Sequence, residues 1–253
     1  MREGRRTFPI SELLLLAASG VAVWVTQLGW VPCAGTMLEG TPFDPTPHDW
    51  NFTAACQAAM DHGDGFPISG WLASPLQQTV NGLNAVALLL LGLAWLLLVH
   101  RCQVRGRVRL ALAALPGLLN LWLAAVAAAA FLWPPAEVPV AAAVAILLMD
   151  IAGVVGALAL FADGATPLGA GSGVRVILLA LAVTAPSLGH ILTDSMIMGT
   201  FSNANWDSPP GTGYLTAFSI GLFALLSMIV GLIARLWTNL RPSQLVQQPL
   251  PAG

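Results

Sequence analysis

Long runs of apolar residues, separated by short polar or Pro- and Gly-rich segments, recur along the whole chain. A bilayer core about 30 Å thick is crossed by a helix of about 20 apolar residues. Segments of that length lie at about 8–31, 79–100, 110–133, 138–162, 175–198 and 214–237. The pattern predicts an all-α, polytopic integral membrane protein with six transmembrane helices.

Composition agrees with this pattern. Hydrophobic residues make up 57% of the 253 residues and charged residues only 9%, and the mean hydropathy is +0.77. A soluble globule of this size could not bury so much apolar surface. We therefore expect residues 1–241 to form a single transmembrane domain with one long outer loop at 32–78. Residues 242–253 hold three prolines and no periodicity, and they are expected to form a disordered cytoplasmic tail.

The positive charges predict the orientation in the membrane. All ten basic residues are arginines, and the predicted spans place them on one side: Arg2, Arg5, Arg6, Arg101, Arg105, Arg107, Arg109, Arg175, Arg235 and Arg241. Because positively charged segments stay in the cytoplasm, both termini are predicted to be cytoplasmic. Arginine without lysine, with spans rich in Ala, Leu and Val, indicates a bacterial plasma membrane. The first span could instead be a secretory signal, but no small-residue cleavage site is evident.

The cysteines divide between the two predicted sides. Cys33 and Cys56 lie on the outer side, whereas Cys102 lies among cytoplasmic arginines and should stay reduced. Disulfides persist in oxidising compartments. We therefore predict a Cys33–Cys56 disulfide that pins the outer loop to the exit of the first span. A redox-active pair is the alternative, but the spacing is not C-x-x-C.

The outer loop also carries imidazole and carboxylate groups, namely His48, Asp49, Asp61, His62 and Asp64. A disulfide could bring them together at a metal ion. The loop lacks an H-E-x-x-H motif and paired-cysteine spacing, so the sequence favours a solvated acidic loop. We expect no metal and no cofactor.

Polar side chains inside the predicted spans are the main functional candidates, because an unpaired charge in hydrocarbon costs at least about 2.5–3.5 kcal/mol. His190 and Asp194 are four residues apart, share a helix face and are expected to form a hydrogen-bonded pair. Asn81 and Asn84 at the outer end of the second span could extend the network. The residues expected to form a polar ladder from the outer face are Asp150, His190, Asp194 and Asn120.

Pro186 removes one backbone hydrogen bond four residues before His190, so this span is expected to be kinked or partly unwound. Two interpretations of the polar residues stay open. They could relay protons or cations through Asp194, His190 and Asp150, or they could hold the helices together as a buried polar network. Glu12, near the inner boundary, is expected to snorkel to the headgroup layer.

Two further motifs are excluded. The segment 209–213 is glycine-rich like a phosphate-binding loop, but Tyr214 stands where that motif needs lysine, and the segment lies on the outer side. We expect neither a nucleotide nor a nucleic acid as partner. The sequence also lacks a serine nucleophile elbow or another catalytic set.

Three functions are compatible with these observations. The first is a non-enzymatic accessory or assembly subunit of a membrane complex, whose outer loop contacts another membrane protein or a second copy. The second is a small proton-coupled secondary transporter with Asp150, His190 and Asp194 in its path. The third is a membrane enzyme that acts at the outer leaflet. The lipid bilayer is the one partner that the sequence itself specifies.

Overall fold

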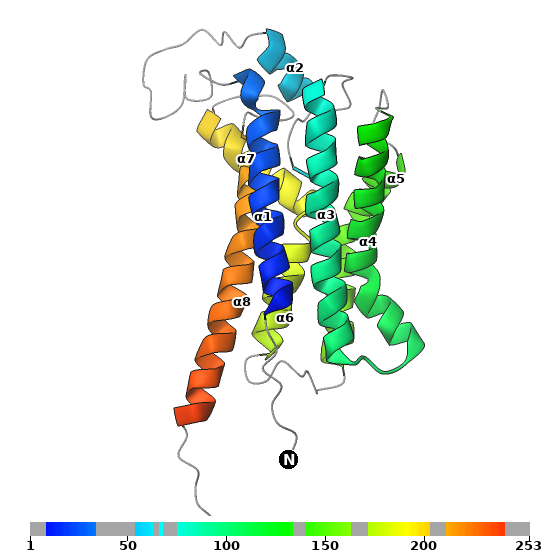
Figure 1. The fold of residues 1–253 in the computed structure, drawn as a ribbon, viewed down its shortest axis with the longest axis vertical. Helices are drawn as coiled ribbons and strands as arrows, with labels where there is room; N and C mark the ends of the chain where they lie inside the picture. The colour runs from blue at the N-terminus through cyan, green and yellow to red at the C-terminus, as the bar shows by residue number, and fades with distance from the viewer. Residues whose placement is uncertain are drawn as a thin grey trace, which may run out of the picture.

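All regular secondary structure in the described part of the chain is helical (Figure 1). A computed structural model describes residues 9–33, 54–62, 66–67, 75–133, 140–162, 172–202 and 211–240. Its helices are α1 (Ile10–Gly29), the 3-10 helix η1 (Val31–Cys33), α2 (Ala54–His62), α3 (Pro75–Cys102), α4 (Arg107–Leu132), α5 (Val140–Phe161), α6 (Ser172–Val183), α7 (Leu188–Ser202) and α8 (Tyr214–Leu240).

The helices confirm an all-helical architecture in the described part of the chain, and their length and composition suit a membrane-embedded protein. Five of them, α1, α3, α4, α5 and α8, are long and apolar enough to cross a membrane. The count becomes six if α6 and α7, which are bent by 72° at a short break, form one span. The predicted span at 175–198 is therefore two helices with a sharp bend between them, because Pro186 lies at the break.

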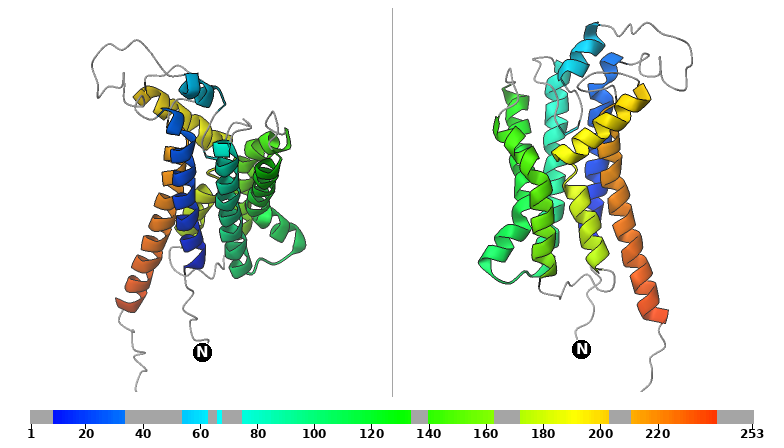
Figure 2. Two further views of the ribbon diagram at one scale, coloured as in Figure 1. Left: turned by 45° about the horizontal axis from the view of Figure 1, so that its top comes forward. Right: turned by 180° about the vertical axis from the view of Figure 1, so that it is seen from behind.

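The long helices run side by side as a bundle (Figures 1 and 2). Neighbouring helices form a ring in the order α1, α3, α4, α5, α6 and α8, and α8 returns to α1. Helix α1 starts and α8 ends at the same end of the bundle, which we call the termini end. The opposite end carries α2, and we call it the disulfide end.

Small residues let the helices approach one another closely, as expected where lipid removes the hydrophobic drive for helix association. A Cβ added to Gly92 of α3 would lie 2.9 Å from the carbonyl oxygen of Gly117 on α4. A Cβ added to Gly221 of α8 would lie 2.7 Å from Oγ of Ser19 on α1. That hydroxyl donates a hydrogen bond to the carbonyl of Ala217 at 2.8 Å. The small residues of α8 therefore serve contacts within this chain.

The disulfide end forms a second, smaller core. The predicted Cys33–Cys56 disulfide is present, with a Cα–Cα distance of 4.6 Å, and it ties η1 to α2. Both cysteines are buried together with Trp30, Ala59 and Met60. The Trp30 indole donates a hydrogen bond to the carbonyl of Thr212 at 2.8 Å. This end of the protein therefore links α1 and α2 to the start of α8.

Several predictions fall on residues that the structure does not describe. They concern the outer-loop ligand candidates His48, Asp49 and Asp64, and the tail at 242–253. The side chains of Asp61 and His62 also lie outside the described set.

Candidate functional site

The break between α6 and α7 is the feature around which the candidate site is built. Pro186 has no N–H to donate, and the backbone turns instead of continuing as a helix. The N–H of Ser187 donates to the carbonyl of Thr184 at 2.9 Å, in a tight turn. The predicted kink at this proline is confirmed.

Asn120 on α4 compensates for the break. Its amide Nδ2 donates to the carbonyl of Val183, the last residue of α6, at 3.0 Å. In an unbroken helix that carbonyl would accept from the N–H of Ser187, which here bonds to Thr184. The same amide also donates to the carbonyl of Pro116 at 2.9 Å. Asn120 is fully buried, and it holds a backbone group that would otherwise be unsatisfied.

The start of α7 is held by two side chains. Ser187, directly before the helix, accepts a hydrogen bond from the N–H of His190 at 3.4 Å, as an N-cap residue does. Asp150 on α5 accepts from the N–H of Gly189 through Oδ2 at 3.2 Å. A Cβ added to Gly189 would lie only 3.0 Å from this oxygen, so the glycine allows the approach. The Asp150 carboxylate therefore caps a helix that belongs to another span.

Asp194 plays the corresponding part at the start of α8. Its Oδ2 accepts from the N–H of Gly213 at 2.9 Å and from the N–H of Thr216 at 2.8 Å. The side chain has no exposed surface. A carboxylate at a helix N-terminus is stabilised by the free N–H groups and by the helix dipole.

The expected hydrogen bond between His190 and Asp194 does not form. The imidazole Nδ1 instead lies 3.0 Å from Oγ of Ser187, and Asp194 turns to the backbone of α8. Their four-residue spacing does place both residues on one face of α7. The charge-assisted bonds to unpaired N–H groups of α8 are the stronger alternative for the carboxylate.

A cavity of about 410 Å³ opens beside the break. Helix α6 packs between α5 and α8, but it ends at Val183, and beyond that residue α7 leads away at an angle (Figure 2). The space that is left is lined by Asp150 of α5, by Gly189, His190 and Thr193 of α7, and by Leu215, Thr216, Ser219 and Phe223 of α8.

The predicted polar residues divide between this cavity and its supports. Asp150 and His190 line the cavity, whereas Asn120 and Asp194 are buried and hold helix ends. Asn81 and Asn84 are buried on α3, and neither lines the cavity. Sequence reasoning missed the hydroxyl groups of Thr193, Thr216 and Ser219, because serine and threonine are common in apolar helices and carry no distinguishing pattern.

No protein-family model, curated protein or solved structure matches this chain.

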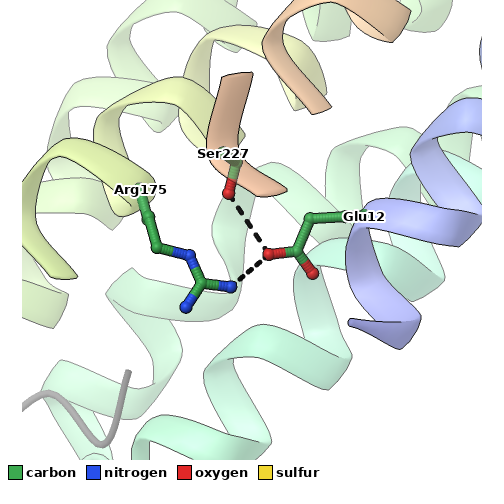
Figure 3. A network of polar contacts seen from close by, with 3 residues as sticks. All are labelled: Glu12, Arg175 and Ser227. Atoms are coloured by element: carbon green, nitrogen blue, oxygen red, sulfur yellow. Dashed lines mark hydrogen bonds and ion pairs between the residues drawn. The ribbon is translucent and has the colours of Figure 1, made fainter. Parts of the chain in front are cut away.

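A second polar cluster lies near the start of α1, toward the termini end, and Figure 3 shows its three residues. The Arg175 guanidinium on α6 donates to Oε1 of Glu12 on α1 and forms an ion pair with it. The Ser227 hydroxyl on α8 donates to the same oxygen at 3.2 Å. Glu12 is only 2% exposed, so the prediction that it snorkels to the headgroups is wrong. The ion pair with Arg175 and the hydrogen bond from Ser227 offset the free-energy cost of burying the Glu12 carboxylate.

One face of α8 connects the cavity with this ion pair. Ser219, Phe223, Ser227 and Gly231 follow one another at intervals of four residues, so they share a helix face. Ser219 and Phe223 line the cavity, Ser227 contacts Glu12, and a Cβ on Gly231 would lie 3.2 Å from the guanidinium carbon of Arg175. Ser227 is about 6 Å from Phe223 along the helix axis. The ion pair therefore lies one turn beyond the cavity, toward the termini end.

Proposed function

We propose that this protein is a small proton-coupled secondary transporter, and that the cavity between α5, α7 and α8 is its substrate and proton site. The observation that carries the proposal is the cavity of about 410 Å³ at a broken helix, with the Asp150 carboxylate and the His190 imidazole in its lining. Asp150 lies near the middle of the 22-residue α5. Broken helices near the bilayer midplane, and ionisable groups exposed there, are typical of transport sites.

Asp150 and His190 are the groups that would exchange protons. Asp150 is exposed to the cavity, and one backbone N–H donates to its carboxylate. Asp194, the third residue of the sequence-based relay, is fully buried and accepts two backbone hydrogen bonds at the start of α8. We therefore assign Asp194 to the support of the site and not to the proton path.

The ion pair between Glu12 and Arg175 could close the transport path on the side of the cavity that faces the termini end. It ties α1, α6 and α8 together one turn beyond the cavity. Alternating access requires that one side of the site is closed while the other is open. Breaking this buried pair and forming it again would allow the termini end to open and close.

The proposed orientation follows from the arginines. Arg101, Arg105, Arg107 and Arg109 lie at or near the junction of α3 and α4, which is at the termini end together with the start of α6. Since arginine-rich segments stay inside, the termini end would face the cytoplasm of a bacterial plasma membrane. The cavity would then be reached from the outer side or from the bilayer.

Proton movement in reconstituted vesicles tests the proposal. Purified protein is placed in phosphatidylcholine vesicles with pyranine inside and a pH gradient across the membrane. Benzyltrimethylammonium, benzenesulfonate and benzamide are added in turn, because these aromatic compounds differ in charge. We expect one class to move protons in the wild type and not in Asp150→Asn. Thr200→Val is the control, since Thr200 is exposed on α7 and does not line the cavity. Equal traces for wild type and Asp150→Asn with all three compounds would overturn the proposal.

An accessory or assembly subunit is the second candidate, and one observation favours it. Only 28% of the candidate span in α8 is buried, against 39–50% for the other candidate spans. A partner helix or a second copy could cover this apolar face. Purification in a mild detergent, followed by native gel sizing and mass spectrometry, would show an equimolar partner if this function is correct.

The contact between Ser187 and His190 at the break does not support the third candidate, an enzyme that acts at the outer leaflet. Ser187 has no exposed surface, and its hydroxyl caps α7. A nucleophile must reach its substrate, so we do not propose this function.

A further inference from the structure

We infer that the cavity binds an amphipathic organic cation, that is, a protonated amine attached to an apolar body. This inference rests on the proposed transport function and adds the class of substrate.

The charge of the lining favours a cation. The cavity is lined by one carboxylate, one imidazole and three hydroxyl groups, and the described lining contains no arginine. In the part of the chain that the structure describes, the N–H of Gly189 is the one donor to the Asp150 carboxylate, and it binds Oδ2. The second carboxylate oxygen is therefore available to an ammonium group. Hydrogen bonds between charged partners are about twice as strong as neutral ones.

The size and the apolar part of the lining favour an organic body over a metal ion. A volume of about 410 Å³ falls within the range of sites for small organic molecules, about 300–1,000 Å³. Leu215 and Phe223 of α8 supply apolar surface beside the hydroxyl groups. An aromatic ring can also stabilise a cation.

The position of Asp150 on α5 indicates how the ligand arrives. Leu147 and Val154, three residues before and four residues after Asp150, share its helix face, and 54% and 62% of their surfaces are exposed. Exposed aliphatic residues in the middle of a membrane helix face lipid. The carboxylate therefore lies on the edge of a lipid-facing surface, where a ligand dissolved in the bilayer can reach it. A strongly hydrated small cation would not arrive by this route.

Cation binding and proton binding would then compete for the same carboxylate. His190 of α7 lines the same cavity as Asp150, and Asp194 follows His190 by four residues on α7. Exchange of an organic cation against a proton at Asp150 is the form of coupling that follows.

Binding of a matched pair of probes tests the inference. Dansylcadaverine is a primary amine joined by an alkyl chain to an aromatic body, and its N-acetyl derivative lacks the charge. Fluorescence anisotropy with the purified full-length protein should show that the amine binds about tenfold or more tightly than the acetyl derivative, since hydrogen bonds to charged groups are the strong ones. Asp150→Asn should remove this difference, and Thr200→Val should keep it. Equal binding of the two probes to the wild type would overturn the inference.

A second variant keeps the test decisive if Asp150→Asn does not fold. Ser219→Leu leaves the carboxylate in place and fills the cavity, so it should weaken the binding of both probes. Unchanged binding of the amine in this variant would overturn the location of the site.

The amine could come from a free compound or from a lipid headgroup. Adding phosphatidylethanolamine to phosphatidylcholine vesicles should weaken dansylcadaverine binding if the headgroup is the natural occupant, and leave it unchanged if a free amine is. Either result supports a cation site.

The transport proposal and the cation inference can fail separately. If benzenesulfonate or benzamide moves protons through Asp150 and the amine does not bind, the transport proposal is supported and the cation inference is wrong. If none of the compounds moves protons, the transport proposal itself is wrong.

Discussion

Asp150 and Asp194 both place a carboxylate at the start of a helix from another part of the chain, yet their surroundings differ. Asp194 is fully buried and accepts hydrogen bonds from two backbone N–H groups of α8 at 2.8 and 2.9 Å. Asp150 is exposed to a cavity and accepts one, from α7, at 3.2 Å. The same chemical group is thus sealed from solvent and bonded twice in one place, and open to a cavity and bonded once in the other.

This difference shows how a membrane acid can be assigned to structure or to function. An acid in hydrocarbon must be compensated by donors or by a cation. Glu12 provides a third case, because an arginine and a serine compensate it. Where compensation by the protein is incomplete and the group is accessible, a ligand or a proton can complete it. Asp150 alone of these three acids meets both conditions.

Loss of Glu12 should give the largest change in stability. Glu12→Leu leaves the Arg175 charge buried without its carboxylate, and removing one partner of a buried ion pair costs about 3–5 kcal/mol. The double variant Glu12→Leu with Arg175→Met should recover most of this loss, since apolar replacement of a buried pair is often neutral. Thermal melting followed by size-exclusion chromatography measures both. An unchanged melting temperature in the single variant would show that the pair contributes nothing.

Loss of Asp194 should give the next largest change. Asp194→Ala removes the acceptor of two backbone hydrogen bonds at the start of α8, for an expected loss of about 2–4 kcal/mol. Asp194→Asn keeps a carbonyl acceptor and should lose less, about 1 kcal/mol. The same melting assay applies. If Asp194→Ala melts like the wild type, the cap is not a stabilising contact.

Loss of the Asp150 charge should have the smallest effect on stability, below about 1 kcal/mol, because Asn can still accept from Gly189 and the protein no longer places a charge near lipid. Proton movement should nevertheless be lost. The comparison between the two aspartates fails if Asp150→Asn lowers the melting temperature as much as Asp194→Asn does.

The sequence allowed the prediction of the helices, the disulfide and the break, because each depends on local signals. Apolar length marks the spans, and Pro186 marks the kink. The sequence did not show which face of each helix packs against its neighbours. Trp95 and Trp122 both lie well inside predicted spans, but Trp95 is 1% exposed whereas Trp122 is 52% exposed. In spans that are apolar on every side, periodicity does not identify the inner face.

The partners of the polar residues were beyond prediction for the same reason. Glu12 and Arg175 lie on different spans, and their pairing depends on α1 and α6 meeting at one height. Asp194 was assigned to a relay because of its spacing from His190. Its partners are backbone N–H groups at the start of a later helix. Almost every residue has such a group, so the sequence does not show which one will accept this role.

The ion pair also constrains the order of biogenesis. Glu12 precedes Arg175 by 163 residues. A chain that emerges from the ribosome in sequence order presents its first hydrophobic helix long before the arginine that neutralises it has been synthesised. Until then, Glu12 must stay in the headgroup region or carry a proton. In the first case the helix reaches its final depth only after α6 has arrived, and in both cases the charged pair that joins α1 to α6 can form only late in synthesis.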